Sequence, residues 1–312
     1  MLAATEDDIP PINAVESDFM PAEKADLDDL ELVIGVLIGG KPRAYPIRLL
    51  SLHEVVNDQV DENLFAVTWC PLCFSAIVYN RLVEDKPLWF RASGYLLNDN
   101  LVLIDRPTET LWSQLLGQGI KGAQRGTLLE IIPSTISPWG VWKETYPDTR
   151  VLSPKTLGYV DGIYDPYTGY YSSGAAGFGS YADPDLRLPG KSLVEGVNLG
   201  DYQVAFPLET LQEEKIIQDY IGSNPFVAFY SDLHQSSRFY LRQINGEELD
   251  FDPSGPGNFL IDEQTGSTWD ALNGIAVDGP LQDMQLQVIP SQLVFWFAWN
   301  RFYPETEIFN LP

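Results

Sequence analysis

The chain has 312 residues, about twice the length of a typical domain of about 150 residues, so it can form one large domain or two cooperating halves. Hydrophobic residues make up 45% of it and charged residues 20%, a composition that excludes an intrinsically disordered protein. The formal net charge of -25 arises from 44 Asp and Glu against 19 Lys and Arg, and it excludes a nucleic-acid-binding function.

Short strands and helices alternate along the chain. β-branched and aromatic runs predict strands at 32–37, 65–69, 75–79, 88–92 and 101–104. Pro46 suits the first turn of a helix from Ile47 to about Asn57. Ser137 and Pro138 predict the start of another helix, in which Trp139, Trp142 and Tyr146 recur at helical spacing. Strands therefore dominate, and short helices flank them.

The sequence repeats itself. Val33 aligns with Val194, a shift of 161 positions that holds without a gap for about forty residues. After one small deletion the shift becomes 157, which aligns Trp112 with Trp269 and Trp139 with Trp296. We therefore expect a β-rich α+β fold of two tandem homologous repeats related by a pseudo-twofold axis, with short helices flanking antiparallel sheets. The predicted parts are an N-terminal extension, a first repeat, a Gly- and Tyr-rich connection and a second repeat, at 1–30, 31–152, 153–191 and 192–312.

Two features bear on the cellular setting. No apolar run approaches the roughly 18 residues that a membrane-spanning helix needs, so no transmembrane segment is expected. The first five residues are followed at once by acidic ones, so we expect no signal peptide in the sequence as given.

The two cysteines form one motif, Cys70-Pro71-Leu72-Cys73, directly after the predicted strand at 65–69. In the second repeat this motif aligns with Ser231 to His234, and His53 aligns with Glu214. The first copy thus holds both thiols and one imidazole at these positions, whereas the second copy holds a hydroxyl, an imidazole and a carboxylate. Groups that the fold needs should persist in both copies, so this asymmetry marks a specialised site.

A metal centre is the first interpretation of this motif. Cys70, Cys73 and His53 supply two thiolates and an imidazole, a ligand set suited to copper or zinc. Glu54 is a candidate to orient His53 from behind. A closed structural zinc site needs a fourth ligand, and no second Cys-x-x-Cys exists, so an open or three-coordinate site is expected.

Two alternatives use the same residues differently. In a thiol-disulfide oxidoreductase, Cys70 would attack a disulfide of another thiol protein and Cys73 would resolve the mixed intermediate. The third interpretation is a structural or glycan-binding cell-surface protein, in which the cysteines are inert. Its tryptophans would pack in the core or, if exposed, hold a sugar ring.

An ordered series of motifs resembles the prokaryotic family called domain of unknown function 3179. The motifs include Ala44-Tyr45-Pro46, the segment from His53 to Asp58, the Cys-x-x-Cys, Leu111-Trp112-Ser113-Gln114 and Phe295-Trp296-Phe297-Ala298-Trp299. The resemblance covers nearly the whole chain and implies a periplasmic or extracellular location. From the cysteine motif and this resemblance together, we expect an exported metal-binding protein rather than an enzyme.

Overall fold

The computed structural model describes Leu2 and residues 8–159, 162–178, 184–252 and 258–310. Parts of the predicted N-terminal extension, connection and second repeat lie outside these residues. The chain divides into two compact units. Unit 1 comprises Met1–Lys191 and Leu293–Phe302, and unit 2 comprises Ser192–Gln292 and Tyr303–Pro312.

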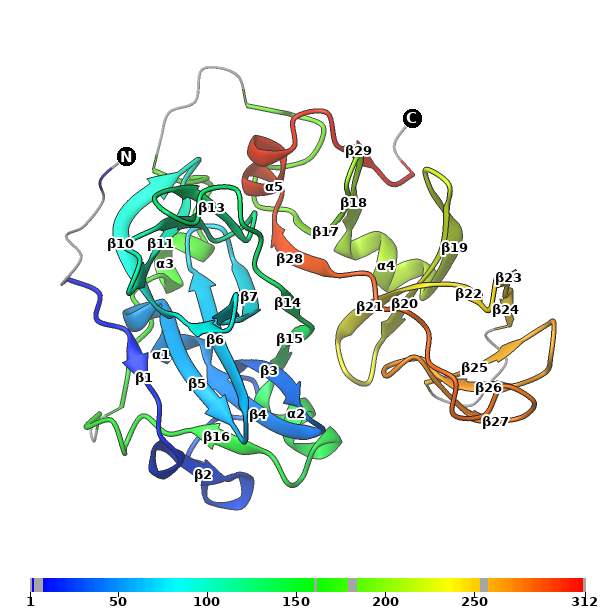
Figure 1. The fold of residues 1–312 in the computed structure, drawn as a ribbon, viewed down its shortest axis with the longest axis horizontal. Coiled ribbons are helices and arrows are strands. Elements are labelled where there is room, and N and C mark those ends of the chain that lie inside the picture. Colours follow the sequence, from blue (N-terminus) through cyan, green and yellow to red (C-terminus); the bar gives the residue numbers. More distant parts are fainter. Residues whose placement is uncertain (1, 3–7, 160–161, 179–183, 253–257, 311–312) are drawn as a thin grey trace. The chain divides into compact units, whose positions relative to one another are not determined.

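Unit 1 contains three main sheets (Figure 1). The first has the order β1-β5-β6-β7-β14, with bounds Ile12–Asn13, Val55–Val60, Asn63–Cys70, Ser75–Asn80 and Ile131–Ile132. The second has the order β15-β3-β4-β16-β2, with bounds Ser134–Pro138, Leu32–Ile38, Lys41–Pro46, Arg150–Leu152 and Phe19–Pro21. The third has the order β10-β11-β12-β13, with bounds Trp89–Leu97, Asn100–Arg106, Leu111–Ser113 and Gln118–Lys121.

Short elements complete unit 1. A two-stranded ribbon joins β8 (Leu82–Val83) to β9 (Lys86–Pro87). The α-helices are α1 (Ile47–His53), α2 (Trp139–Thr145), α3 (Thr168–Tyr171) and α5 (Trp296–Phe302). The 3₁₀ turns are η1 (Glu16–Asp18) and η2 (Ala22–Lys24).

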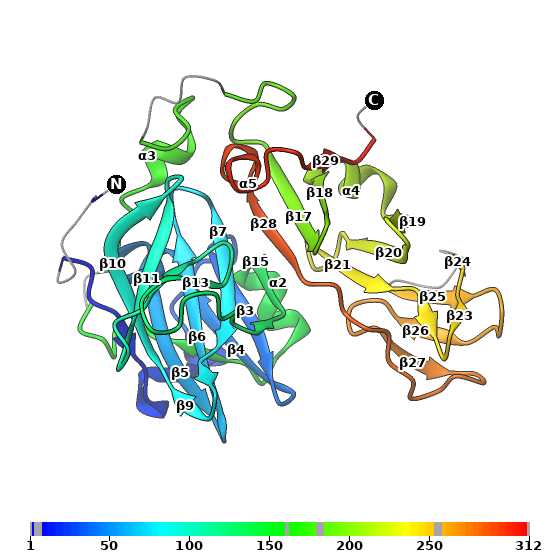
Figure 2. The same cartoon turned by 45° about the horizontal axis from the view of Figure 1, so that its top comes forward.

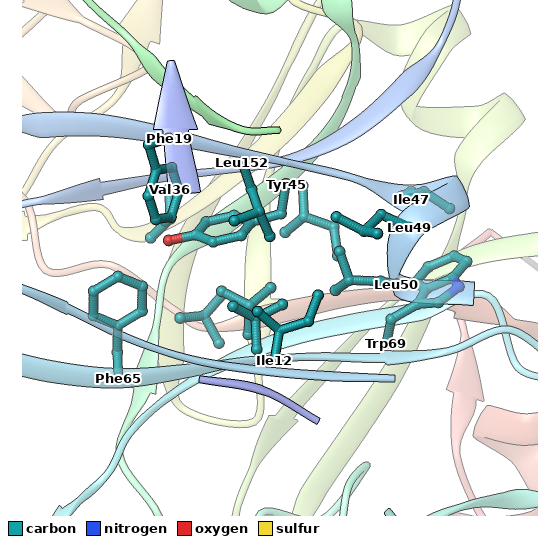
Figure 3. Packing of buried hydrophobic residues seen from close by; sticks show 14 of the residues in the cluster. Ile12, Phe19, Val36, Tyr45, Ile47, Leu49, Leu50, Phe65, Trp69 and Leu152 are labelled. Atoms are coloured by element: carbon teal, nitrogen blue, oxygen red, sulfur yellow. The ribbon is translucent and has the colours of Figure 1, made fainter. Parts of the chain in front are cut away.

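Strand β6 shows how the sequence pattern positions the candidate site. Side chains alternate across a strand, so Phe65, Val67 and Trp69 point into one hydrophobic cluster. Figure 3 shows Trp69 beside Leu50 at one end of this cluster and Phe65 at the other. Thr68 and Cys70 therefore face the opposite side of the sheet, where they contact Gln114 and Asp99. These two residues lie in turns of the sheet of β10 to β13, whose ribbon is drawn in Figure 2.

Helix α1 is shorter than the sequence predicted. It ends at His53 because Glu54 adopts a left-handed conformation with φ 58°, and its N–H closes the last turn on the Leu50 carbonyl at 2.6 Å. The following residues, Val55–Val60, pair with β6 as strand β5. β-Branched Val55 and Val56 favour that pairing over another helical turn.

Unit 2 is also built from antiparallel sheets. One has β17 (Leu193–Leu199) paired with β18 (Tyr202–Pro207), with β29 (Glu307–Ile308) parallel to β18. The others comprise β19, β20 and β21, then β24, β25, β26 and β27, then the ribbon of β22 and β23. Strands β19, β20 and β21 are Ile216–Ile221, Asn224–Ser231 and Ser236–Leu241. Strands β24 to β27 are Phe251–Asp252, Phe259–Asp262, Thr268–Asp270 and Ile275–Asp278. Strands β22 and β23 are Gln243–Ile244 and Glu247–Glu248. Helix α4 is Leu208–Glu214. Strand β28 (Ser291–Phe295) carries the chain back to unit 1.

The coarse fold prediction is confirmed: the protein is β-rich, with several antiparallel sheets and a few short helices. Two boundaries differ from the sequence-based division. Strands β1 and β2 of the predicted extension pair with β5 and β16, so this segment is part of unit 1. Residues 293–302, assigned by sequence to the second repeat, also belong to unit 1. Within the described residues, no helix is long and apolar enough to cross a membrane.

Candidate functional site

The Cys-x-x-Cys motif forms the turn between β6 and β7. Cys70 is the last residue of β6 and pairs with Ser75, the first residue of β7. The Cys73 N–H donates to the Cys70 carbonyl at 3.2 Å, which closes the turn. Both cysteines are free thiols, and they are 2% and 0% exposed.

The two sulfurs converge on one backbone oxygen. The carbonyl of Asp99 lies 3.9 Å from Cys70 Sγ and 3.4 Å from Cys73 Sγ. Burial raises the pKa of the Cys73 thiol well above its usual range, and the neighbouring Cys70 thiol raises it further, while the Asn100 side chain lowers it. The turn thus holds a pair of adjacent thiols, of which Cys73 strongly favours its neutral form.

Phe74 fixes the turn from within the hydrophobic core. Its backbone is left-handed, with φ 54°, a conformation that costs a non-glycine residue about 1–3 kcal/mol. Its ring packs against Trp69, Tyr171 and Phe295, with centroid separations of 5.2, 5.6 and 5.3 Å. These aromatic contacts keep the conformation in place and leave the thiol pair with little freedom to move.

Two hydrogen bonds from distant segments hold the turn from outside. The Phe295 N–H donates to the Cys73 carbonyl at 2.9 Å, and the Tyr170 hydroxyl donates to the Leu72 carbonyl at 2.9 Å. Tyr170 also accepts a hydrogen bond from the Gly177 N–H at 2.9 Å, and Lys191 donates to its carbonyl. The segment from Tyr170 to Gly177 therefore lies beside the cysteine turn.

Asp99 is fixed by an ion pair. It follows Asn98 in the turn between β10 and β11, where both residues have positive φ. Its carboxylate lies 2.7 Å from Arg301 of α5, and the two side chains are 3% and 16% exposed. The Asn98 amide donates to the Arg301 carbonyl at 3.1 Å. Helix α5 therefore holds the carbonyl that faces both sulfurs.

A buried polar network lies beside the cysteines. The Gln114 carbonyl oxygen accepts hydrogen bonds from Ser75 at 2.9 Å and from Asn100 at 2.8 Å, and its amide donates to the Thr68 hydroxyl at 3.2 Å. All four residues are 0% exposed, and their mutual bonds satisfy polar groups that could not otherwise be buried.

His53 is not joined to the thiols. Its Nδ1 lies 2.7 Å from the Pro10 carbonyl and its Nε2 lies 2.8 Å from the Tyr159 hydroxyl. Because a carbonyl can only accept, Nδ1 carries a proton, and in the neutral imidazole Nε2 then accepts from the Tyr159 hydroxyl. Both ring nitrogens are thus engaged elsewhere. Within the described residues, no three His, Cys, Asp or Glu side chains are grouped closely enough to hold a metal ion.

Glu54 does not orient His53 by a hydrogen bond, and within the described residues its carboxyl forms none. It is 9% exposed, and burial raises the pKa of its carboxyl to about 7. It lies near Tyr167, since the Glu54 charge is one cause of the raised pKa of that phenol, after burial itself. The structure thus buries an acid whose charged form is disfavoured.

We expect Glu54→Gln to change how stability depends on pH. The folded-state pKa of about 7 lies above the ordinary 4.5, so the folded protein binds more protons than the unfolded chain between these values. Stability from this group is present below pH 4.5 and is lost as the pH rises through 7. Between pH 5.5 and 8 the wild type should lose about 2 kcal/mol more than the variant. Urea denaturation at both pH values measures the difference, and Glu62→Gln, at an exposed position, is the control.

Comparison with known proteins gives one match. A family model described as "Protein of unknown function (DUF3179)" matches residues 6–306. No curated protein and no solved structure matches the chain.

Proposed function

The chain belongs to the DUF3179 family of proteins of unknown function, and we propose that it binds one monovalent copper ion between the thiolates of Cys70 and Cys73. The observation that carries this proposal is the convergence of both sulfurs on the Asp99 carbonyl, at 3.9 and 3.4 Å. Two sulfurs that share one neighbour are placed to share one ion.

The ligand set favours copper over zinc. Thiolates are soft ligands and select copper(I), which binds stably with two of them, whereas a structural zinc ion takes four ligands. Within the described part of the chain, the cysteines have no third side-chain ligand beside them. His53, which the sequence suggested as a ligand, would first have to leave Tyr159 and Pro10.

The surroundings of the turn suit a metal ion better than a large partner. Thiols that are 2% and 0% exposed, in a turn that Tyr170 contacts, are poorly placed to attack a disulfide of another protein. A bare ion needs a much smaller opening. Binding replaces the two thiol protons with copper(I), releases them to solvent and leaves one negative charge on the centre. Lys191 brings positive charge to the segment beside the turn, while the charge of Arg301 is offset by Asp99.

Titration of the reduced protein with copper(I), in competition with a chromogenic copper(I) chelator, tests the proposal. We expect one equivalent to bind to the wild type. Cys70→Ser and Cys73→Ser should each weaken binding by at least about 100-fold, because loss of a supporting residue alone typically costs about 10- to 100-fold. Unchanged uptake by either serine variant would contradict the proposal. His53→Gln should bind normally if two thiolates suffice, and weakly if the imidazole is recruited.

The same geometry supports a second candidate, a thiol-disulfide redox centre. Both sulfurs lie on one short turn and face the same Asp99 carbonyl, at 3.9 and 3.4 Å, which favours a disulfide between them. The balanced reaction is exchange with a low-molecular-weight disulfide: the two protein thiols become a disulfide and two thiols of the reagent are released. Rapid alkylation of Cys70 in the native protein, with no copper binding, would favour this candidate.

We further infer that the chain arose by duplication. Matching contacts in the two units support this: Trp112 Nε1 donates to Asp105 at 2.8 Å, and Trp269 Nε1 donates to Asp262 at 2.8 Å. Three expectations from the sequence stay predictions. They are the pseudo-twofold arrangement, the periplasmic or extracellular location, and the structural or glycan-binding alternative.

A further inference from the structure

Unit 1 contains a cavity of about 330 Å³ that is separate from the cysteine turn. It lies between β2, the start of α1, the end of β16 and the residues that follow β16. Met20, Leu27, Val151 and Leu152 contribute apolar walls. Its volume is at the lower end of the range of small-molecule pockets, about 300–1,000 Å³. It can therefore hold a ligand of about ten non-hydrogen atoms.

Ser153 supplies a buried hydroxyl to this cavity. The residue lines the cavity and is 2% exposed, and its Oγ has no hydrogen-bond partner within the described residues. Its backbone is fully used, because the N–H donates to the Asp18 carbonyl at 2.9 Å and the carbonyl accepts from Thr156 at 2.9 Å. A buried hydroxyl without a partner costs about 1–3 kcal/mol, which a polar ligand atom in the cavity would offset.

Arg48 supplies a cation to the same cavity. Its Nε lies 2.7 Å from Glu31 Oε1, but neither atom has hydrogen-bond geometry toward the other or toward another described group. The Arg48 side chain is 29% exposed. Its planar guanidinium therefore has donors available for a carboxylate.

A second ion pair among the described residues also lines the cavity. Lys155 Nζ lies 2.7 Å from Asp26 Oδ2, with the two side chains 55% and 79% exposed. These charges offset each other, and solvent screens them. Arg48 also has an acidic partner, Glu31, but its side chain is less exposed than that of Lys155, and its guanidinium has further N–H donors for a ligand carboxylate.

We propose that this cavity binds a medium-chain organic acid, with its carboxylate on Arg48 and the Ser153 hydroxyl and its hydrocarbon chain against Met20, Leu27 and Val151. The cavity does not include the cysteines, so the proposal does not depend on copper binding. Tyr159 lines the cavity and also contacts His53 through its hydroxyl.

Isothermal titration calorimetry of the full chain with octanoate, which has ten non-hydrogen atoms, tests the proposal. We expect octanoate to bind with one equivalent, 1-octanol to bind at least tenfold more weakly for lack of the charge, and acetate not to bind for lack of the chain. Arg48→Gln should weaken octanoate binding by about tenfold or more, and Ser153→Ala by a smaller factor. Lys41→Gln removes a cation paired with Asp61 outside the cavity and should change nothing.

A second variant covers the case in which Arg48→Gln does not fold. Ala25 lines the cavity and is only partly buried, so Ala25→Leu should narrow the cavity without removing a charge and should abolish octanoate binding. No binding of octanoate to the wild type would overturn the proposal. So would binding that is equally tight for 1-octanol, or equally tight in the folded Ala25→Leu variant.

Discussion

Replacing Arg301 with methionine is expected to lower the free energy of unfolding by about 3 kcal/mol. The carboxylate of Asp99 is 3% exposed and lies 2.7 Å from the guanidinium. Without that counter-charge a buried carboxylate would remain beside the two thiols, and the loss of one partner of a buried ion pair costs about 3–5 kcal/mol. We take the lower end because the Arg301 side chain is 16% exposed.

Urea denaturation followed by tryptophan fluorescence measures this effect. The double variant Asp99→Asn with Arg301→Met should recover at least half of the lost stability, because it removes both charges. Lys143→Met, which breaks an exposed ion pair with Asp29, is the control and should cost less than about 1 kcal/mol. A single Arg301→Met variant as stable as the control would show that α5 does not hold Asp99 by charge.

Replacing Gln114 with methionine should cost about 3 kcal/mol. Methionine has a similar length and volume but removes the amide, so Ser75 and Asn100 lose a shared acceptor and Thr68 loses a donor. All of these groups are buried, so water does not readily replace the missing partner.

The control for this substitution is Gln59→Met, at an exposed position of β5, which should change the free energy of unfolding by less than about 0.5 kcal/mol. The two variants are compared by urea denaturation under the same conditions. Equal stability of the two would mean that the network beside the cysteines does not contribute to the fold.

The strand pattern was predictable because it is local. Phe65, Val67 and Trp69 alternate with smaller or polar residues, and the strand at this place follows from that period. The end of α1 was not predictable in the same way. The choice between helix and strand at Val55 depends on pairing with Thr68, which lies across a hairpin.

In the candidate site, too, residues close together in the sequence were predictable and residues far apart were not. Cys70 and Cys73 stood out because they are close in the sequence and have no counterpart in the second half. Asp99 and Arg301 did not stand out in the sequence, because 202 positions separate these two partners of the ion pair. The sequence did hold a sign that Gln114 is special to the first half, because the 157-residue shift aligns it with Ala271. The predicted repeat thus pairs an amide at position 114 with a methyl group at position 271.

The comparison of the two halves gave no information about the hydrogen-bond partners of His53. It was singled out as one of two histidines that differ between the copies. Its partners come from Pro10 and Tyr159, in the N-terminal segment and the 153–191 connection. Neither segment has a counterpart in the other half, so their contacts could not be inferred from it.

X-ray absorption spectroscopy at the copper edge of the copper(I)-loaded protein tests the proposed site most directly. We expect two sulfur neighbours around the copper in the wild type and loss of this signal in Cys73→Ser. A first shell of nitrogen or oxygen in the wild type, or a sulfur shell that persists in Cys73→Ser, would contradict copper binding by this turn.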